Sequence, residues 1–259
     1  MNILDEIVAH KKEQLHIRQI MVPVDEIVGS KYFDVKCRSL VQSVLDKNKS
    51  GIIAEFKRKS PSRGFINQHA DVREVTKNYT SAGASGLSVL TDSEYFGGGT
   101  DDLVLAREND IPILRKEFII DPYQILTTKA MGADAILLIA SILTPAQVQN
   151  FAESAKKLGL EVLLEIHDES ELGHICDEVD MVGVNNRNLK NFEVDLQHSI
   201  NLSNKIPAGK IKIAESGISS PQVMKELRDA GFHGFLIGET FMKESNPGLA
   251  LEVFIKQLK

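Results

Sequence analysis

Residues 133–167 read ADAILLIA, SIL, TPAQVQNFAESAKKLG and LEVLLEIH in succession, and they contain the clearest structural signal in the chain. The first and last runs are short and mostly apolar, as expected of strands in a parallel sheet that is covered on both faces. Between them, Thr144 suits an N-cap, Pro145 the first helical position and Gly159 the end of a helix. The stretch predicts a strand, a helix and a second strand.

The same pattern recurs along most of the chain. Asp121-Pro122 and Ser220-Pro221 repeat the helix start, and Ala82–Ala84 and Met131–Ala133 look like short turns from helix to strand. Eight strands are predicted in all, at Gly51–Lys57, Gly86–Asp92, Pro112–Phe118, Ala133–Ala140, Leu160–His167, Asp180–Arg187, Lys210–Ser216 and Phe232–Gly238.

Eight strand–helix units at this spacing predict an α/β fold of the (β/α)8 TIM barrel type. An open doubly wound sheet is the structural rival, but it usually has fewer units. Because no segment rich in Pro, Gly or Ser separates two parts, we expect one domain over 1–259, with the barrel at 50–259.

Extra N-terminal helices are expected over residues 1–49. One apolar helical face contains Ile3, Leu4, Ile7, Val8 and Leu15, and another contains Leu40, Val41, Val44 and Leu45. Such helices would cap the bottom or side of the barrel; alternatively, they would dock a partner or cover the substrate mouth. The pattern favours capping.

Composition indicates a globular cytoplasmic protein. Apolar residues make up 42% and charged residues 25%, and the two cysteines, Cys37 and Cys176, suit a reducing compartment. The net charge of -6 gives no broad attraction to nucleic acid, and no apolar run approaches a membrane span. The first residues resemble no secretory signal. We therefore expect a small-molecule substrate, no nucleic-acid or membrane partner, and a monomer.

Charged and amide residues interrupt the apolar pattern where the predicted strands end, which is where barrel enzymes carry their active sites. An ion pair at a strand end is the simpler explanation for any one of them, such as Glu55 with Lys57. Glu165 lies among apolar residues, and we expect burial to raise its pKa. The full set at strand ends is Glu55, Lys57, Lys116, Glu165, Asn185, Arg187, Glu215 and Glu239.

Small residues follow the last two predicted strands, at Ser216-Gly217 and Gly238. The loops at these positions bind phosphate in many barrels, although glycines can also simply end strands. Together with the strand-end charges, they predict a lyase or isomerase that acts on a sugar phosphate without a cofactor.

The sequence lacks the common motifs for nucleotide binding and for metal binding. The sequence has no GxGxxG after the first strand, no GxxxxGK[ST] and no HExxH, so neither nucleotide binding nor a metal site is indicated. His167 could be a ligand or a base, but a hydrogen-bonded structural histidine is the expected role.

The strand ends also resemble those of one known family, the indole-3-glycerol-phosphate synthases of tryptophan biosynthesis. The resemblance extends over nearly the whole chain, and its motifs are specific as a set. They are AEFKRKSPSRG (Ala54–Gly64), LSVLTDSEYFGGG (Leu87–Gly99), ILRKEFIIDPYQI (Ile113–Ile125), LLEIHD (Leu163–Asp168), VGVNNRNLKNFEVD (Val182–Asp195), AESGI (Ala214–Ile218) and IGETFM (Ile237–Met242).

The resemblance implies closure of an indole ring in 1-(o-carboxyphenylamino)-1-deoxyribulose 5-phosphate, with loss of carbon dioxide and water and with neither metal nor cofactor. It implies Lys116 as general acid and Glu165 as general base, with Lys57 binding the substrate carboxylate. The other implied contacts are Glu55, Asn185, Arg187, Glu215 and Ser60 to the substrate, Phe96 and Phe118 to its aromatic ring, and Ser216, Gly217, Gly238 and the backbone of Glu239 to its phosphate.

Some points stay open. Lys57 and Lys116 would act as acids at neutral pH if burial or repulsion lowered a pKa, and the sequence does not say which lysine serves which step. Glu239 replaces a serine found in some members, and Arg115 and Glu117 should point away from the centre. Phosphoribosylanthranilate isomerase is an alternative, but it uses a cysteine and an aspartate near strand ends 1 and 5. The other alternative is a phosphate-binding barrel without catalytic activity.

Overall fold

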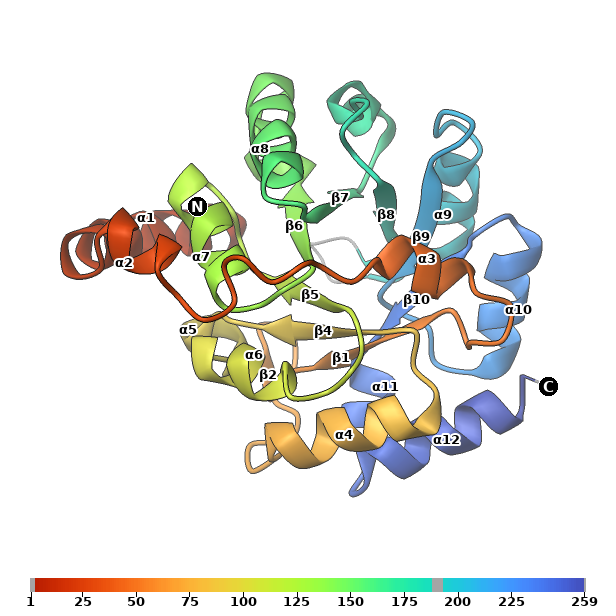
Figure 1. Ribbon diagram of the computed structural model, residues 1–259. Coiled ribbons are helices and arrows are strands. Elements are labelled where there is room, and N and C mark those ends of the chain that lie inside the picture. The colour runs from red at the N-terminus through yellow and green to blue at the C-terminus, as the bar shows by residue number, and fades with distance from the viewer. Residues whose placement is uncertain (1–2, 188–192, 259) are drawn as a thin grey trace.

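The computed structural model describes residues 3–187 and 193–258, and eight parallel strands close into a barrel within them. The hydrogen-bonded order is β1-β10-β9-β8-β7-β6-β5-β4, which returns to β1 (Figure 1). The predicted (β/α)8 barrel is therefore confirmed. Its strands are β1 (Ile52–Phe56), β4 (Gly86–Leu90), β5 (Ile113–Lys116), β6 (Ala135–Ile139), β7 (Glu161–Ile166), β8 (Met181–Asn185), β9 (Ile211–Glu215) and β10 (Gly234–Ile237).

Helices surround the barrel, and a small antiparallel pair of strands, β2 (Lys59–Ser60) and β3 (Gly64–Phe65), follows β1. The helices are α1 (Ile3–Met21), α2 (Val24–Val28), α3 (Leu40–Leu45), α4 (Val72–Ala82), α5 (Ser93–Phe96), α6 (Thr100–Ala106), α7 (Pro122–Ala130), α8 (Pro145–Lys157), α9 (Leu196–Ser203), α10 (Pro221–Asp229), α11 (Glu239–Met242) and α12 (Pro247–Lys256). Two 3-10 helices are η1 (Ala140–Ile142) and η2 (Glu169–His174).

The predicted helix starts have the expected geometry. The Thr144 side chain accepts from the backbone of Gln147, whose own side chain returns the contact, and Asp121 and Gln124 form the same capping box. One connection differs from the prediction, because β7 and β8 are joined by the short η2 and not by an α-helix. The connection, residues 167–180, contains no helix other than η2.

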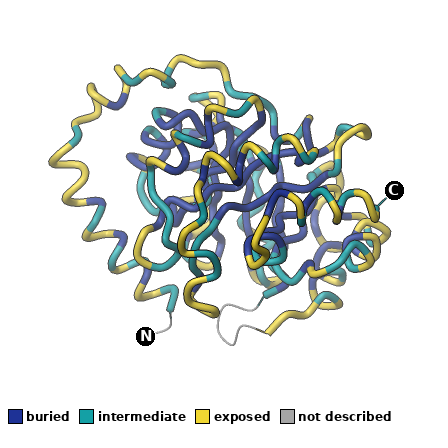
Figure 2. The backbone as a smooth tube through the Cα atoms, turned by 90° about the horizontal axis from the view of Figure 1, so that it is seen from below, coloured by how far each residue is buried: buried dark blue, intermediate teal, exposed yellow. Residues whose placement is uncertain are grey.

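Side chains alternate between two apolar layers along each strand. Ile53, Leu114 and Leu163 point into the barrel, whereas Ile52, Ala54 and their counterparts pack against the helices. Figure 2 shows the strands as a buried centre inside a more exposed shell. Since the alternation continues to the strand ends, residues two positions further along the chain also point inward.

The N-terminal end of the barrel is closed by α3. Leu40 and Val44 belong to the interior cluster, and they lie over the glycines that begin β4 and β10. A Cβ at Gly86 would lie 2.4 Å from Leu40 Cδ1, and one at Gly234 would lie 2.7 Å from Val44 Cγ1. The lack of a side chain at Gly86 and Gly234 therefore leaves space for Leu40 and Val44, which together form an apolar plug at this end of the barrel. The expectation that Leu45 belongs to the same face is wrong, because it is 44% exposed.

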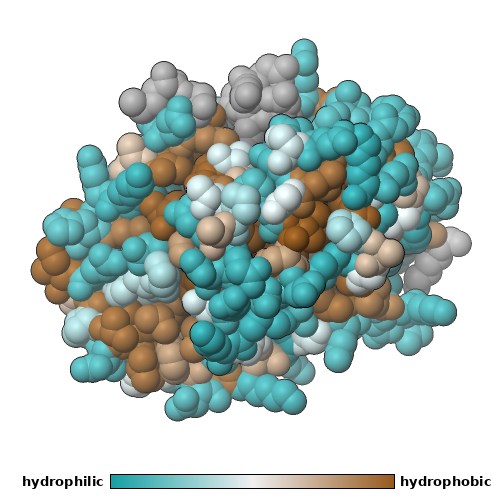
Figure 3. Space-filling view, turned by 90° about the horizontal axis from the view of Figure 1, so that it is seen from above, coloured by the Kyte–Doolittle hydropathy of each residue, from teal (hydrophilic) through white to brown (hydrophobic). Residues whose placement is uncertain are grey.

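The first two helices lie along the side of the barrel against α7, where Leu15, Ile27 and Tyr123 form a separate cluster (Figure 1). Ile7 is also buried on α1, while Val8 is only half-buried. Large apolar side chains remain on the surface, Ile20 and Met21 among them, and Figure 3 shows hydrophobic patches between hydrophilic side chains on one face. Scattered exposure of this kind is usual for folded proteins.

Candidate active site

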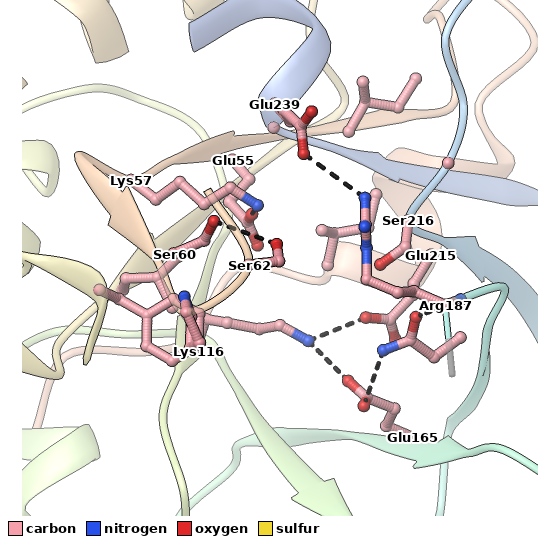
Figure 4. Close-up of a pocket in the computed structure, with 18 of the residues that line it drawn as sticks. Glu55, Lys57, Ser60, Ser62, Lys116, Glu165, Arg187, Glu215, Ser216 and Glu239 are labelled. Carbon is pink, nitrogen blue, oxygen red and sulfur yellow. Dashed lines mark hydrogen bonds and ion pairs between the residues drawn. The ribbon is translucent and has the colours of Figure 1, made fainter. Parts of the chain in front are cut away.

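The inward positions become polar at the carboxyl ends of the strands. Glu55 follows Ile53 on β1, Lys116 follows Leu114 on β5, and Glu165 follows Leu163 on β7. Figure 4 shows their charged groups converging from different strands. The barrel thus brings together side chains that are far apart in the sequence.

A cavity of about 440 Å³ opens at this end of the barrel. Every site residue predicted from the sequence lines this cavity, and so do the apolar residues Ile3, Leu4 and Ile7 of α1. The N-terminal helices therefore both close the bottom of the barrel and reach its mouth. The nominated residues are Glu55, Lys57, Ser60, Phe96, Lys116, Phe118, Glu165, Asn185, Arg187, Glu215, Ser216, Gly217, Gly238 and Glu239.

The Lys116 ammonium lies between two carboxylates. Its Nζ is 2.7 Å from Glu165 Oε2 and 2.8 Å from Glu215 Oε2. Both carboxylates are almost fully buried, and Asn185 Nδ2 donates to the other oxygen of Glu165 at 3.1 Å (Figure 4). Glu215 Oε1 is buried and accepts no hydrogen bond from any residue that the structure describes.

This arrangement sets the charges of the three groups. Burial favours neutral forms, but Glu165, Glu215 and Glu55 outweigh it and raise the pKa of Lys116. For Glu165, burial is outweighed by Lys116, His167 and Asn185, so its pKa is lowered. Burial and repulsion from Glu165 prevail at Glu215, and they raise its pKa despite Lys116.

One sequence expectation about these groups is therefore wrong, and one condition is not met. The pKa of Glu165 falls where a rise was expected, because a lysine from another strand lies beside it. The pKa of Lys116 rises because its neighbours are carboxylates, so the lowered pKa that was the condition for an acid at neutral pH is not found at this lysine. Neither partner could be identified from the local sequence, since each lies on a different strand.

A second ion pair lies across the cavity. Lys57 Nζ is 2.7 Å from Glu55 Oε1, as the simpler explanation of the two residues anticipated. A Cβ at Gly238 would lie 2.6 Å from the same Glu55 oxygen. Gly238 therefore leaves space for the Glu55 carboxylate beside the loop that follows β10. Ser60 lies on β2, with its Oγ 3.5 Å from Ser62 Oγ (Figure 4).

The loops after β9 and β10 form the third part of the cavity wall. Ser216 has φ 65° and Gly217 has φ 69°, so a non-glycine residue holds a left-handed conformation at the end of β9. Such conformations are costly and concentrate at functional sites. Arg187 and Arg63 approach the Glu239 carboxylate at 3.4 and 3.3 Å. The resemblance implied a phosphate contact for the Glu239 backbone only. The structure shows that the Glu239 side chain also takes part in the site, through its contacts with the two arginines.

An aromatic pair lines the opposite wall. The rings of Phe96 and Phe118 have centroids 5.9 Å apart. Behind them, Lys11 of α1 binds Asp92 at 2.8 Å and Glu117 at 3.0 Å. Asp92 caps α5, which carries Phe96, and Glu117 accepts from the backbone of Phe118. Lys11 was missed in the sequence, because a lysine on an amphipathic helix gives no sign of burial.

Arg115 of β5 is buried and donates to Thr91, Thr127 and Thr128, away from the cavity. Glu117 accepts from Thr91 on the same side. The Arg115 side chain therefore points away from the centre, as expected, whereas Glu117 is also among the residues that line the cavity.

His167 does not have the expected environment. Both ring nitrogens are buried, and neither makes a hydrogen bond to a residue of the described chain. Its Nε2 is 3.4 Å from Glu165 Oε1. The expectation of a hydrogen-bonded structural histidine is therefore wrong.

In residues 3–187 and 193–258, no group of three or more His, Cys, Asp or Glu is arranged to hold a metal ion. None of the helices described is long and apolar enough to cross a membrane. Residues 188–192, part of the motif at Val182–Asp195, lie outside the described chain.

Fold and site together define a (β/α)8-barrel enzyme with buried acid–base groups at the carboxyl ends of its strands. The family model described as indole-3-glycerol phosphate synthase matches residues 4–254. The chain belongs to the indole-3-glycerol phosphate synthase family, and it is therefore a carboxy-lyase of tryptophan biosynthesis.

Curated relatives agree with this assignment. An indole-3-glycerol phosphate synthase from Bacteroides thetaiotaomicron is 46% identical, with 100% of this chain and 99% of the relative covered. One from Bordetella pertussis is 41% identical, with 96% and 97% covered. The crystal structure of tryptophan synthase subunit alpha from Legionella pneumophila has a TM-score of 0.61, 14% identity, and coverage of 85% and 97%, which supports the fold alone.

Proposed function

We propose that the residues around Lys116 carry out ring closure, decarboxylation and dehydration of the carboxyphenylamino sugar phosphate. The observation that carries this proposal is the Lys116 ammonium held between Glu165 and Glu215 at the cavity floor. The raised pKa keeps this ammonium protonated at neutral pH. It can still release its proton to the alkoxide that forms during ring closure, because an alkoxide is a stronger base than a lysine amine.

In the first step, the ring carbon that bears the carboxyl group attacks the carbonyl carbon of the sugar chain. A carbon–carbon bond forms, and the carbonyl oxygen takes up the electron pair. Lys116 gives its proton to this oxygen. A donor that is already aimed at the developing charge lowers the barrier by about 3 kcal/mol.

Carbon dioxide then leaves, and the electrons of the broken bond restore the aromatic ring. Dehydration follows, in which an acid protonates the departing hydroxyl and a base removes a proton to form the double bond. We assign the base to Glu165, whose lowered pKa keeps it ionised and able to accept a proton. Lys57 binds the substrate carboxylate and then supplies the proton to the hydroxyl; its position beside Glu55 supports this role.

The remaining residues are proposed to hold the substrate. Phe96 and Phe118 flank its ring, while Ser60, Arg187 and Glu215 contact its polar groups, with Glu55 and Asn185 orienting the charged side chains. The phosphate contacts Ser216, Gly217, Gly238 and the Glu239 backbone. Support for this placement comes from the two left-handed residues after β9 and from the nearby guanidinium of Arg187.

Glu165→Gln tests the proposed base. The amide keeps the contacts with Lys116 and Asn185 in part but cannot take a proton, so we expect kcat to fall by about 100-fold or more, with KM changed far less. Steady-state assays that follow indole absorbance with EDTA-treated protein give both constants. An effect on KM alone would remove Glu165 from this role. Glu153→Gln on α8, away from the cavity wall, is a matched control for the same chemical exchange, and it should leave both constants unchanged.

A further inference from the structure

His167 lies next to the proposed base but outside the cavity wall. It follows β7 two residues after Glu165, so its ring points to the same side of the strand. Its side chain is 15% exposed, and it is absent from the residues that line the cavity. His167 therefore reaches the substrate only through Glu165.

The imidazole ring stands between two carboxylates. Nε2 is 3.4 Å from Glu165 Oε1, and Nδ1 is 3.8 Å from Glu171 Oε2 on η2. A carboxylate can only accept, and a neutral imidazole has one donor and one acceptor nitrogen. Only the doubly protonated ring carries a positive charge, and attraction to the two carboxylates at these distances favours that cation.

Other groups around the ring agree with that charge. Glu215 on β9 and Asp168 in the same loop also interact with it electrostatically. His198 on α9 contacts the backbone of His167 and not its ring: His198 Nε2 lies 2.8 Å from the His167 backbone oxygen. Burial lowers the pKa of His167, but Glu171 and Glu165 outweigh it and raise that pKa.

We propose that His167, as an imidazolium, is a positioning residue that aims the Glu165 carboxylate and keeps it ionised until the dehydration step. The inference rests on the proposed role of Glu165 as base. Its two oxygens have different partners: Lys116 holds Oε2, while Asn185 and His167 approach Oε1.

The two partners matter at different times. Once Lys116 has given its proton to the substrate, it no longer provides positive charge beside Oε2, and the pKa of Glu165 rises. A second cation at Oε1 opposes this rise. His167 thereby stops Glu165 from taking a proton before the dehydration step requires it.

The kinetic test is His167→Gln, which keeps a polar side chain but removes the charge. Because loss of a nearby cation raises the pKa of Glu165, the acid limb of the pH profile of kcat/KM should move up by about one unit. We expect kcat to fall about tenfold and KM to change less than about threefold. His198→Gln, on the same loop contact, should leave the profile in place. An unchanged acid limb in active His167→Gln protein would overturn the inference.

A second measurement needs neither turnover nor a folded His167 variant. Titration of the imidazole signals by NMR in wild type and in Glu165→Gln gives the pKa of His167 with and without its neighbour. The coupling is reciprocal, so the pKa of His167 should fall by about one unit in Glu165→Gln. An unaltered pKa would overturn the inference even if turnover were normal. Absence of turnover with this coupling intact would instead overturn the proposed function.

Discussion

The two ends of the barrel are built from the same strands, but one end is filled with apolar side chains and the other with charged ones. At the N-terminal end, glycines admit the apolar side chains of Leu40 and Val44, and the interior is filled. At the carboxyl end, glycines admit carboxylates: a Cβ at Gly183 would lie 2.1 Å from Glu215 Oε1. Close packing gives the first end its stability, whereas the second buries charges that require partners.

The largest expected effect is at the carboxyl end. Lys116→Met keeps the length of the side chain but removes the proposed acid, so kcat should fall by about 1,000-fold or more, which corresponds to about 4 kcal/mol of barrier. Assays at saturating substrate measure this loss, and circular dichroism checks that the variant is folded. Lys49→Met is the control at the other end, where Lys49 Nζ contacts Ser43 of α3. Comparable losses in both variants would erase the distinction between the ends.

At the N-terminal end we expect an effect on stability alone. Leu40→Ala removes a side chain with 0% exposure and should lower the free energy of unfolding by about 3 kcal/mol. Leu45→Ala on the same helix, where the side chain is 44% exposed, should cost less than about 1 kcal/mol. Urea denaturation gives both values. The kcat of folded Leu40→Ala should stay within about twofold of wild type, and a larger drop would mean that the plug also shapes the site.

The same contrast explains what could be predicted from the sequence. Strands, helix starts and inward positions follow from local rules, so the neighbours of Thr144, Asp121 and Glu165 in the chain are enough to place these residues. Charge states depend on partners that the closed barrel brings together, and the Lys116–Glu165–Glu215 contacts join three separate strands. Lys11 was missed for the same reason, because its carboxylate partners, Asp92 and Glu117, lie far from it in the chain. His167 differs, since Glu165 and Glu171 lie only two and four residues away, and only the folded structure shows that both carboxylates face its ring.

The smallest expected effect measures the cost of burying charge at the carboxyl end. Burial, helped by repulsion from Glu165 and opposed by Lys116, raises the pKa of Glu215 from 4.5 to about 7. A raised folded-state pKa stabilises the protein fully below the unfolded value, and this contribution is lost as pH rises through the folded one. Wild-type stability should therefore decline by about 1–3 kcal/mol more than that of Glu215→Gln between pH 5 and pH 8.

Urea denaturation of both proteins across this pH range makes the comparison. Glu215→Gln should be the more stable of the two at pH 8 and the less active at every pH, because the amide removes both the buried charge and an acceptor for the substrate. Parallel pH profiles of stability would show that Lys116 fully compensates the Glu215 charge in the fold. Burial of the Glu215 charge would then not lower the free energy of unfolding, and in this respect it would resemble burial of the apolar plug at the other end.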